Sequence, residues 1–190
     1  MTMEISWDSL NTAIRSCTQC GLARGITNKV PGQGDPHARL MLIGEGPGAQ
    51  EDAQGLAFVG AAGQLLTRML GAISLTREEV YITNTVKCRP PNNRAPSPEE
   101  TAACLPFLRA QTALIRPQVI LVLGASALKV VLGPDKRITS SRGQWTLSKG
   151  VWILPTYHPA ALLRDPARKR EAWADLCLLR DKLAELPEKV

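Results

Sequence analysis

The sequence predicts an α/β protein with a three-layer α/β/α architecture and a central parallel sheet of four strands. Four short apolar runs, most of them rich in β-branched residues, alternate with segments whose apolar residues recur at helical spacing. A chain that alternates in this way forms a parallel sheet covered by helices on both faces, with right-handed crossovers. At 190 residues it is long enough to bury its own core, so we expect residues 1–190 to form a single domain.

The four predicted strands are short and apolar, which is typical of strands buried in a parallel sheet. They are RLMLIG, VYITN, QVILVLG and VWILPTY, at residues 39–44, 80–84, 118–124 and 151–157. Three of them end at Gly or Asn, which mark the exit from a strand. Ligands of open α/β sheets bind at the carboxyl ends of the strands, so the segments after these runs should carry the site.

Helical spacing predicts helices before, between and after the strands. The first occupies residues 8–17, with Ser6 or Asp8 available as its N-cap. Further helices are predicted over residues 63–73, 97–115, 125–133 and 168–186. The helix that begins at Ser97 has the strongest start signal, because the letters SPEE supply an N-cap, a proline at the first helical position and a capping-box glutamate.

Three polar residues follow three different predicted strands. Glu45 comes after the first, Asn84 ends the second, and His158 comes directly after the fourth. Taken singly, the histidine could be structural and the asparagine could cap a strand end. Because the carboxyl ends of parallel strands meet at one edge of the sheet, we expect the three side chains to lie together and form a site.

The loop after the first strand, GEGPGAQEDAQGLAFVG at residues 44–60, carries three acids before Phe58 and no lysine or arginine. Its start matches the G-x-G-x-x-A pattern of dinucleotide-binding folds, but a helical segment occupies the place of the second strand whose terminal acid that motif requires. A phosphate-binding P-loop is excluded, since no Gly-Lys-Ser/Thr follows. The loop therefore suits a neutral or cationic group better than a phosphate.

The chain has five cysteines, and their spacing favours metal ligation over disulfides in a reducing compartment. Cys17 and Cys20 form a C-x2-C pair, whereas Cys88 and Cys104 lie far downstream. Four thiolates suit either structural zinc or an iron-sulfur cluster, and ligand chemistry alone does not choose between them. The wide second spacing favours a cluster. Chance burial of unrelated cysteines remains an alternative, and Cys177 is expected to pack in the core.

Charge and hydropathy narrow the functional class. The formal net charge of +6 is weakly in favour of a polyanionic partner such as nucleic acid. The first ten residues, MTMEISWDSL, lack the apolar core of a signal peptide, and there is no uninterrupted apolar run of 18 residues. We therefore expect a soluble, cytoplasmic protein with no membrane partner.

Several motifs together resemble the family-four uracil-DNA glycosylases, the iron-sulfur class. They are GEGPGAQEDAQGLAFVGAAGQLL, YITNTVKCRPPNNRAPSPEE, RGQW, HPAALLR and the four cysteines, which appear in the family's order between Cys17 and Arg164. The resemblance implies the uracil-DNA glycosylase fold and hydrolysis of the bond between uracil and deoxyribose, which leaves an abasic site and initiates base excision repair. It also implies a 4Fe-4S cluster held by Cys17, Cys20, Cys88 and Cys104, with structural zinc less favoured.

The resemblance also assigns roles within the site. Phe58 would stack on a flipped uracil, and the Asn84 amide would pair with its N3–H and O4. His158 would donate to O2 as negative charge develops, and Glu45 would position water and stabilise the sugar cation. In family-one enzymes the catalytic Asp aligns with Gly46, so Glu45 lies one position earlier. The predicted catalytic residues are Glu45, Asn84 and His158, and the predicted substrate-binding residues are these three with Gly46, Glu51 and Phe58.

The predicted partner is uracil-containing DNA, single- or double-stranded, bound by a monomer in a prokaryotic cytoplasm close to the nucleoid. Basic side chains on loops near the same rim would contact phosphates: Lys87, Arg94, Arg142 and Arg164. In HPAALLR, Leu162 stands where resembling families carry the leucine that fills the gap left by the flipped base, and Leu163 is expected to pack in the core.

Two other classes of function stay open from the sequence. One is a non-catalytic nucleic-acid-binding module stabilised by a four-cysteine metal site. The other is a nucleotide-binding oxidoreductase that uses the cluster for electron transfer. The first predicts salt-sensitive DNA binding without an abasic product, and the second predicts affinity for a dinucleotide.

Overall fold

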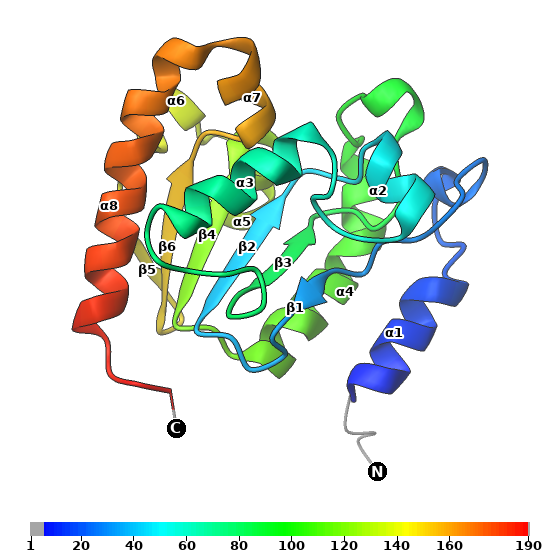
Figure 1. The fold of residues 1–190 in the computed structure, drawn as a ribbon. Coiled ribbons are helices and arrows are strands. Elements are labelled where there is room, and N and C mark those ends of the chain that lie inside the picture. The colour runs from blue at the N-terminus through cyan, green and yellow to red at the C-terminus, as the bar shows by residue number, and fades with distance from the viewer. Residues whose placement is uncertain (1–5, 190) are drawn as a thin grey trace.

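In the computed structural model, which describes residues 6–189, six strands form one mixed sheet in the order β1-β3-β2-β4-β6-β5 (Figure 1). The four central strands are parallel, as predicted: β2 (Leu40–Gly44), β3 (Tyr81–Asn84), β4 (Val119–Leu123) and β6 (Val151–Thr156). The edge strands β1 (Gln33–Gly34) and β5 (Thr146–Ser148) run antiparallel to their neighbours. The α/β class is therefore confirmed, but the sheet is mixed and six-stranded rather than purely parallel and four-stranded.

The two edge strands carry little sequence signal. β1 has only two residues, and all three side chains of β5 are exposed, so neither shows an apolar run. β5 forms a hairpin with β6 through Lys149 and Gly150, whose φ angles are 50° and 82°. Positive φ at both turn residues is the geometry of a type I′ turn, which matches the twist of antiparallel strands.

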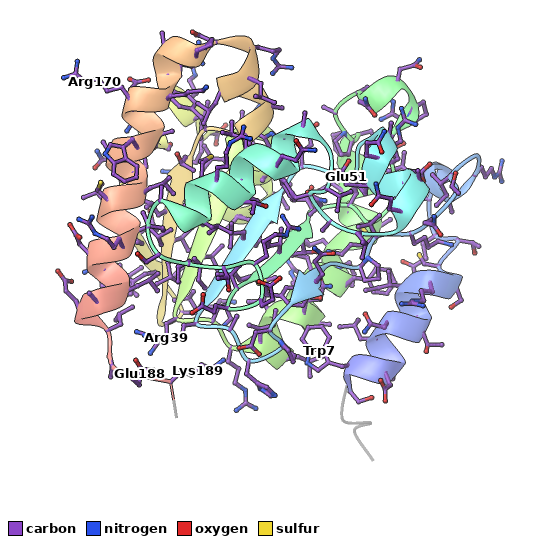
Figure 2. All side chains as sticks on the ribbon, viewed as in Figure 1. Trp7, Arg39, Glu51, Arg170, Glu188 and Lys189 are labelled. Atoms are coloured by element: carbon purple, nitrogen blue, oxygen red, sulfur yellow. The ribbon has the colours of Figure 1, made fainter. Side chains whose placement is uncertain are left out.

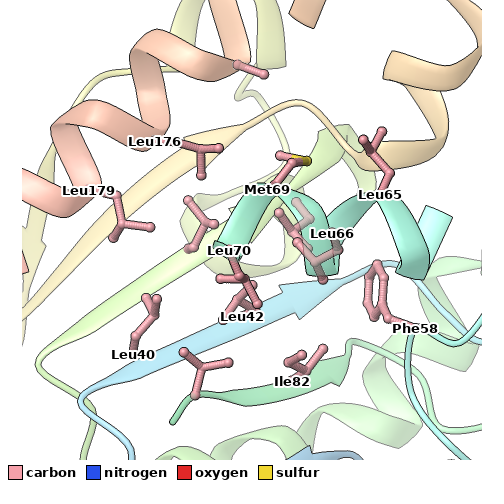
Figure 3. Packing of buried hydrophobic residues seen from close by; sticks show 14 of the residues in the cluster. Leu40, Leu42, Phe58, Leu65, Leu66, Met69, Leu70, Ile82, Leu176 and Leu179 are labelled. Atoms are coloured by element: carbon pink, nitrogen blue, oxygen red, sulfur yellow. The ribbon is translucent and has the colours of Figure 1, made fainter. Parts of the chain in front are cut away.

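Helices cover both faces of the sheet, as predicted. On one face, α3 (Ala61–Gly71) and α8 (Lys169–Glu185) pack on Leu40, Leu42 and Leu121 (Figures 1 and 3). On the other, α4 (Pro98–Ile115) and α5 (Gly124–Leu132) pack on Met41, Ile43 and Val122. Successive side chains of β2 point to opposite faces, so one apolar strand contributes to both layers.

The helix starts follow their local signals. In α1 (Trp7–Ser16) the N-cap is Ser6, which forms a reciprocal capping box with Ser9. In α4 the predicted capping box is present, with Ser97 accepting from the backbone of Glu100 and Glu100 accepting from the backbone of Ser97. These caps satisfy backbone N–H groups that have no partner within the helix.

Short elements connect this framework to the edge where the strands end. They are the helices α2 (Ala49–Gln54), α6 (Ile138–Ser141) and α7 (Pro159–Arg164) and the 3-10 turns Gly21–Ala23, Pro91–Asn93 and Pro166–Arg168. Gly44 is paired with Asn84 and Leu123 with Thr156, so β2, β3, β4 and β6 end level with one another. Arg39 and Lys189 lie together at the opposite end of the sheet (Figure 2). Within residues 6–189 no helix has the length and apolarity needed to cross a membrane.

Candidate active site

A cavity of about 590 Å³ lies at the carboxyl ends of the central strands. Its walls include Glu45 after β2, Asn84 at the end of β3, and His158 after β6. The structure therefore brings together the three polar residues that the sequence placed at this edge. Phe58 and Glu51, from the acidic loop and α2, line the same cavity.

Asn84 is the most enclosed polar group of the cavity. The residue is 1% exposed, and its side-chain Oδ1 has no hydrogen-bond partner among the described residues. A buried acceptor without a donor costs about 1–3 kcal/mol, so this oxygen is suited to a donor supplied by a ligand. Gly44 makes room for it, because a Cβ at that position would lie 2.5 Å from Asn84 Oδ1 and 2.5 Å from Phe58 Cζ.

Phe58 forms an aromatic wall beside Asn84. Its side chain is buried against the carboxyl end of β2, beneath the start of α3 (Figure 3). The ring centroid is 5.5 Å from that of His158, with the two planes tilted by 32°. The backbone of Phe58 has a φ of 52°, a left-handed conformation that is unfavourable for an aromatic residue.

His158 is the N-cap of α7 and presents one hydrogen-bond donor. Its Nδ1 accepts from the backbone N–H of Ala160 at 3.1 Å, so the hydrogen of the neutral ring resides on Nε2. Burial, with a smaller contribution from the charge of Arg164, lowers the pKa of His158 to about 4, and Glu51 opposes both effects. The imidazole is therefore neutral at physiological pH and donates through Nε2.

Glu45 lines the cavity and directly follows the last residue of β2. Its backbone oxygen accepts from Thr85 Oγ1 at 2.6 Å and from the backbone N–H of Val86 at 3.3 Å, which fixes the residue against the segment after β3. At the next position, a Cβ on Gly46 would lie 2.9 Å from Val86 Cγ2. Residue 46 therefore has no room for an acidic side chain, and the acid of this segment is at residue 45 instead.

Glu51 shapes the loop that carries Phe58. Its Oε1 accepts from the backbone N–H groups of Val59 and Gly60 at 2.9 and 2.8 Å, and its Oε2 accepts from that of Gly48 at 3.1 Å. The carboxylate lies between α2 and α3 near the rim (Figure 2). Three backbone donors on one carboxylate hold both sides of the loop together.

The four cysteines of the predicted metal site line a second, much smaller cavity of about 20 Å³. Cys17 and Cys20 come from the segment after α1, Cys88 from the segment after β3 and Cys104 from α4. All five cysteines of the chain are free thiols. Burial, with a smaller contribution from the neighbouring Cys104, raises the pKa of Cys88 to about 12. Within residues 6–189 no three or more His, Cys, Asp or Glu side chains are gathered closely enough to hold a metal ion.

Comparison with known proteins gives a consistent result. Residues 31–177 match the family model of the uracil DNA glycosylase superfamily. A Type-4 uracil-DNA glycosylase of Thermotoga maritima is 47% identical over 168 residues, which cover 86% of this chain and 86% of that protein. One of Sulfurisphaera tokodaii is 42% identical over 193 residues, covering 97% and 87%. A Type-5 uracil-DNA glycosylase of Pyrobaculum aerophilum is 33% identical over 150 residues, covering 70% and 66%.

The chain belongs to the type-4 uracil-DNA glycosylase family. This membership confirms the resemblance drawn from the motifs. The remaining predicted site residues are those expected to contact DNA. Some of them line the cavity, whereas others are buried or paired inside the fold.

Two of the predicted phosphate contacts are wrong. Lys87 is 1% exposed, and its ammonium donates to Thr83 Oγ1 at 2.6 Å and to the backbone oxygen of Asn84 at 2.7 Å. Arg142 is held by Asp175, to which it donates from both Nε and Nη2, and it donates again to the backbone oxygen of Glu171. Both side chains are engaged inside the fold and do not present a free cation to DNA.

Arg94 and Arg164 remain at the cavity, as predicted. Both line its walls. Arg94 donates to both carboxylate oxygens of Glu100, at 2.8 and 2.7 Å, and Arg164 ends α7 with its side chain exposed. The Arg94 side chain is 46% exposed, so it remains accessible at the rim although it is paired with Glu100.

The two leucines of α7 are exchanged relative to the prediction. Leu162 is 2% exposed and packs in the core with Leu65 and Leu176, whereas Leu163 is 42% exposed. Assigning the gap-filling role to Leu162 and a core position to Leu163 was therefore wrong. The two residues are adjacent on a short helix, and only the packing of α7 on the sheet decides which of them faces inward.

The sequence did not single out two other residues of the cavity wall. Tyr157 and Arg168 both line it, and the Arg168 guanidinium carbon lies 5.1 Å from the centre of the Tyr157 ring. The position of Tyr157 immediately before His158, at the end of β6, was an available signal. Arg168 had none, because the path of the chain from α7 to α8 brings it back to the rim.

Proposed function

We propose that this chain is a uracil-DNA glycosylase that removes uracil from DNA and leaves an abasic site, the first step of base excision repair. The observation that carries the proposal is the buried, unpaired Oδ1 of Asn84, at the wall of a cavity shared with Phe58 and His158. Family membership supports the same activity.

Recognition of uracil follows from the polarity of the Asn84 amide. Its oxygen would accept from N3–H of uracil and its Nδ2 would donate to O4. Cytosine presents an acceptor at N3 and an amino donor at C4, so it would face like groups on both atoms while the amide keeps this orientation. Leaving the Asn84 oxygen without a donor costs about 1–3 kcal/mol, and selectivity arises from that cost.

The reaction separates charge, and the residues of the site would stabilise both charges. The C1′–N1 bond breaks with its electron pair going to uracil, and a water oxygen forms the new bond to C1′. His158 Nε2–H donates to uracil O2 as negative charge develops, a contact worth about 3–4 kcal/mol in comparable sites. Glu45 stabilises the cationic sugar and accepts a proton from the water, while solvent supplies a proton to the departing base.

The base must leave the helix to enter the cavity, at a cost of a few kcal/mol in a duplex. Phe58 offsets part of this cost by stacking on the ring. Arg94 and Arg164 contact phosphates at the rim. We assign the filling of the vacated position to Leu163, because it is the exposed leucine of α7.

A 4Fe-4S cluster held by Cys17, Cys20, Cys88 and Cys104 completes the proposal, with structural zinc as the less favoured occupant. The four free thiols line one cavity, which supports a cysteine-ligated group, although their side chains would have to turn toward one another to hold it. When bound, such a group would join the segment after α1 to the segment after β3 and to α4. Its role in this chain would be structural, because no described residue lines both the cysteine cavity and the rim cavity.

We further propose that residues 1–190 act as one domain and as a monomer on uracil-containing DNA, single- or double-stranded. The basic balance of the chain supports a polyanionic partner. The setting we propose is a prokaryotic cytoplasm, close to the nucleoid.

The direct test uses oligonucleotides that differ only in carrying one uracil, thymine or cytosine. Purified protein is incubated with each, single- and double-stranded, and alkali then cleaves any abasic site. Scission is expected only with uracil, and His158→Ala and Asn84→Ala should each lower its rate about 10²–10³-fold. His37→Ala is the matched control, because His37 is exposed and lies outside the cavity.

The outcomes without scission distinguish the alternative functions. Absence of uracil-dependent scission by the wild type would overturn the proposal. Salt-sensitive DNA binding without scission would then indicate a non-catalytic binding module, and affinity for a dinucleotide would indicate an oxidoreductase.

A further inference from the structure

Arg77 has no role in the reaction as described, yet its guanidinium lies directly behind the aromatic wall of the cavity. Nη2 donates to the backbone oxygen of Ala57 at 2.6 Å, and Nη1 donates to that of Phe58 at 3.0 Å. Nη1 also lies 3.3 Å from Thr67 Oγ1 on α3. Within residues 6–189 Arg77 forms no ion pair with a carboxylate, so the Ala57 and Phe58 carbonyls and the Thr67 hydroxyl are its hydrogen-bond partners there.

The segment that Arg77 contacts is one that would not adopt its conformation unaided. Phe58 has a φ of 52°, and a non-glycine residue held in this region is strained. Its carbonyl is also confined by α3, because a Cβ on Gly63 would lie 1.9 Å from the Phe58 oxygen. The peptide that orients the ring is therefore enclosed between a helix and a guanidinium.

The backbone around Phe58 is held by two charged side chains, Arg77 and Glu51. The carbonyls of Ala57 and Phe58 accept from Arg77, and the following two amides, of Val59 and Gly60, donate to Glu51. The turn that carries Arg77 is itself fixed, because Glu79 accepts from the backbone N–H and the hydroxyl of Thr76 at 2.7 and 2.8 Å. An unfavourable backbone conformation persists only where its surroundings over-determine it in this way.

We propose that Arg77 is a positioning residue for Phe58, which fixes the plane on which the target pyrimidine stacks. The inference rests on the proposed function, since the stacked ligand is the uracil of that reaction. Two carbonyls on one planar fork require arginine, because a lysine ammonium can replace the charge but not the paired geometry. Arg77 acts through Phe58 and does not itself touch the substrate.

The test is a double-mutant cycle on uracil release. Arg77→Ala should lower kcat/KM about 10- to 100-fold, mostly through KM, because a displaced stacking wall weakens the productive pose. Arg77→Lys should recover only part of the loss. In a Phe58→Ala background, Arg77→Ala should change kcat/KM less than about twofold, because interacting residues give non-additive effects. If the two losses multiply instead, Arg77 does not act through Phe58 and the proposal is overturned.

The matched control is Arg68→Ala, which removes the same charge from an exposed position of α3 outside the cavity. All variants are assayed well below their melting temperatures. Amide hydrogen exchange gives a readout that needs no activity: Arg77→Ala should speed exchange of Val59 and Gly60 while Arg68→Ala should not. Unchanged exchange would overturn the proposal. An inactive wild type would instead overturn the glycosylase assignment, leaving exchange to decide the role of Arg77.

Discussion

The rim cavity and the cysteine cavity share one stretch of chain, yet they are built in opposite ways. The rim cavity has a volume of about 590 Å³ and contains a buried acceptor that no described residue satisfies. The cysteine cavity has about 20 Å³ and is walled by thiols and by apolar side chains such as Leu22, Val86 and Phe107. A space with unsatisfied polar groups suits a ligand that enters and leaves, whereas a small thiol-lined space suits a permanently held group.

The segment from Asn84 to Cys88 connects the two. Asn84 faces the rim cavity, and Lys87 and Cys88 face the cysteine cavity. The Lys87 ammonium bonds to the backbone oxygen of Asn84, and burial lowers its pKa to about 7. The cysteine cavity thus lies directly behind Asn84, the residue proposed to select the base.

The largest effect is expected from removing a cysteine. Cys104→Ala should abolish iron binding and lower the free energy of unfolding by several kcal/mol, because metal binding to thiolates contributes directly to folding. Iron and sulfide content, visible absorbance and thermal melting measure this. Cys177→Ala, the matched control outside the cavity, should change none of them. Equal effects of the two variants would contradict a specific four-cysteine site.

Next in size is the contrast between the two leucines of α7. Leu162→Ala should lower the free energy of unfolding by about 2–5 kcal/mol, as for other fully buried leucines. Leu163→Ala should change it by less than about 0.5 kcal/mol, because the side chain is exposed. It should nevertheless slow uracil release from duplex DNA more than from single strands. Denaturant unfolding and the two release rates test the pair, and a duplex defect confined to Leu162→Ala would reverse the assignment.

A single added methyl group should damage the rim cavity alone. In Gly44→Ala the new Cβ would meet Asn84 Oδ1 and Phe58 Cζ, each at 2.5 Å, so one of the two must move. We expect kcat/KM to fall about 10²-fold, as for a displacement of about 1 Å in a catalytic site. Visible absorbance of the cysteine site should stay unchanged. Full activity in this variant would show that the base does not bind between these side chains.

The smallest effect concerns pH. His158 has a pKa of about 4 in the folded protein, below the value of about 6.5 of an unfolded chain. Between these values the unfolded state binds more protons, so stability should fall as the pH drops from 6.5 to 4 and should not fall further from this residue below 4. Relative to His158→Gln, the loss should be about 1–2 kcal/mol after allowance for partial exposure. A pH dependence identical in both proteins would contradict a neutral His158.

Most of the framework could be predicted because its signals are local. Neighbouring residues alone identify the apolar runs at β2, β3, β4 and β6 and the capping box of α4. The edge strands were missed because β1 is two residues long and β5 buries no side chain. Pairing of such short strands depends on the neighbouring strand and leaves little periodicity in the sequence.

The site was predictable as far as strand ends determine it. Glu45, Asn84 and His158 could be placed together because parallel strands end at one edge. Lys87 could not be placed, because nothing in its neighbours shows that its ammonium turns inward to Thr83 and Asn84. The role of Arg77 could not be predicted for a related reason. It donates to the backbone oxygens of residues 57 and 58, which lie about 20 positions earlier and approach it only in the folded protein.

The central claim is that the unpaired oxygen of Asn84 accepts a hydrogen bond from N3 of the pyrimidine. Inhibition by free 1-methyluracil and by 1,3-dimethyluracil tests it most directly. The two compounds differ only at N3, where the second has a methyl group in place of the hydrogen-bond donor. We expect the first compound to inhibit the wild type and the second to inhibit it at least tenfold more weakly, and we expect this difference to be abolished in Asn84→Ala. Equal inhibition of the wild type by both compounds would contradict it.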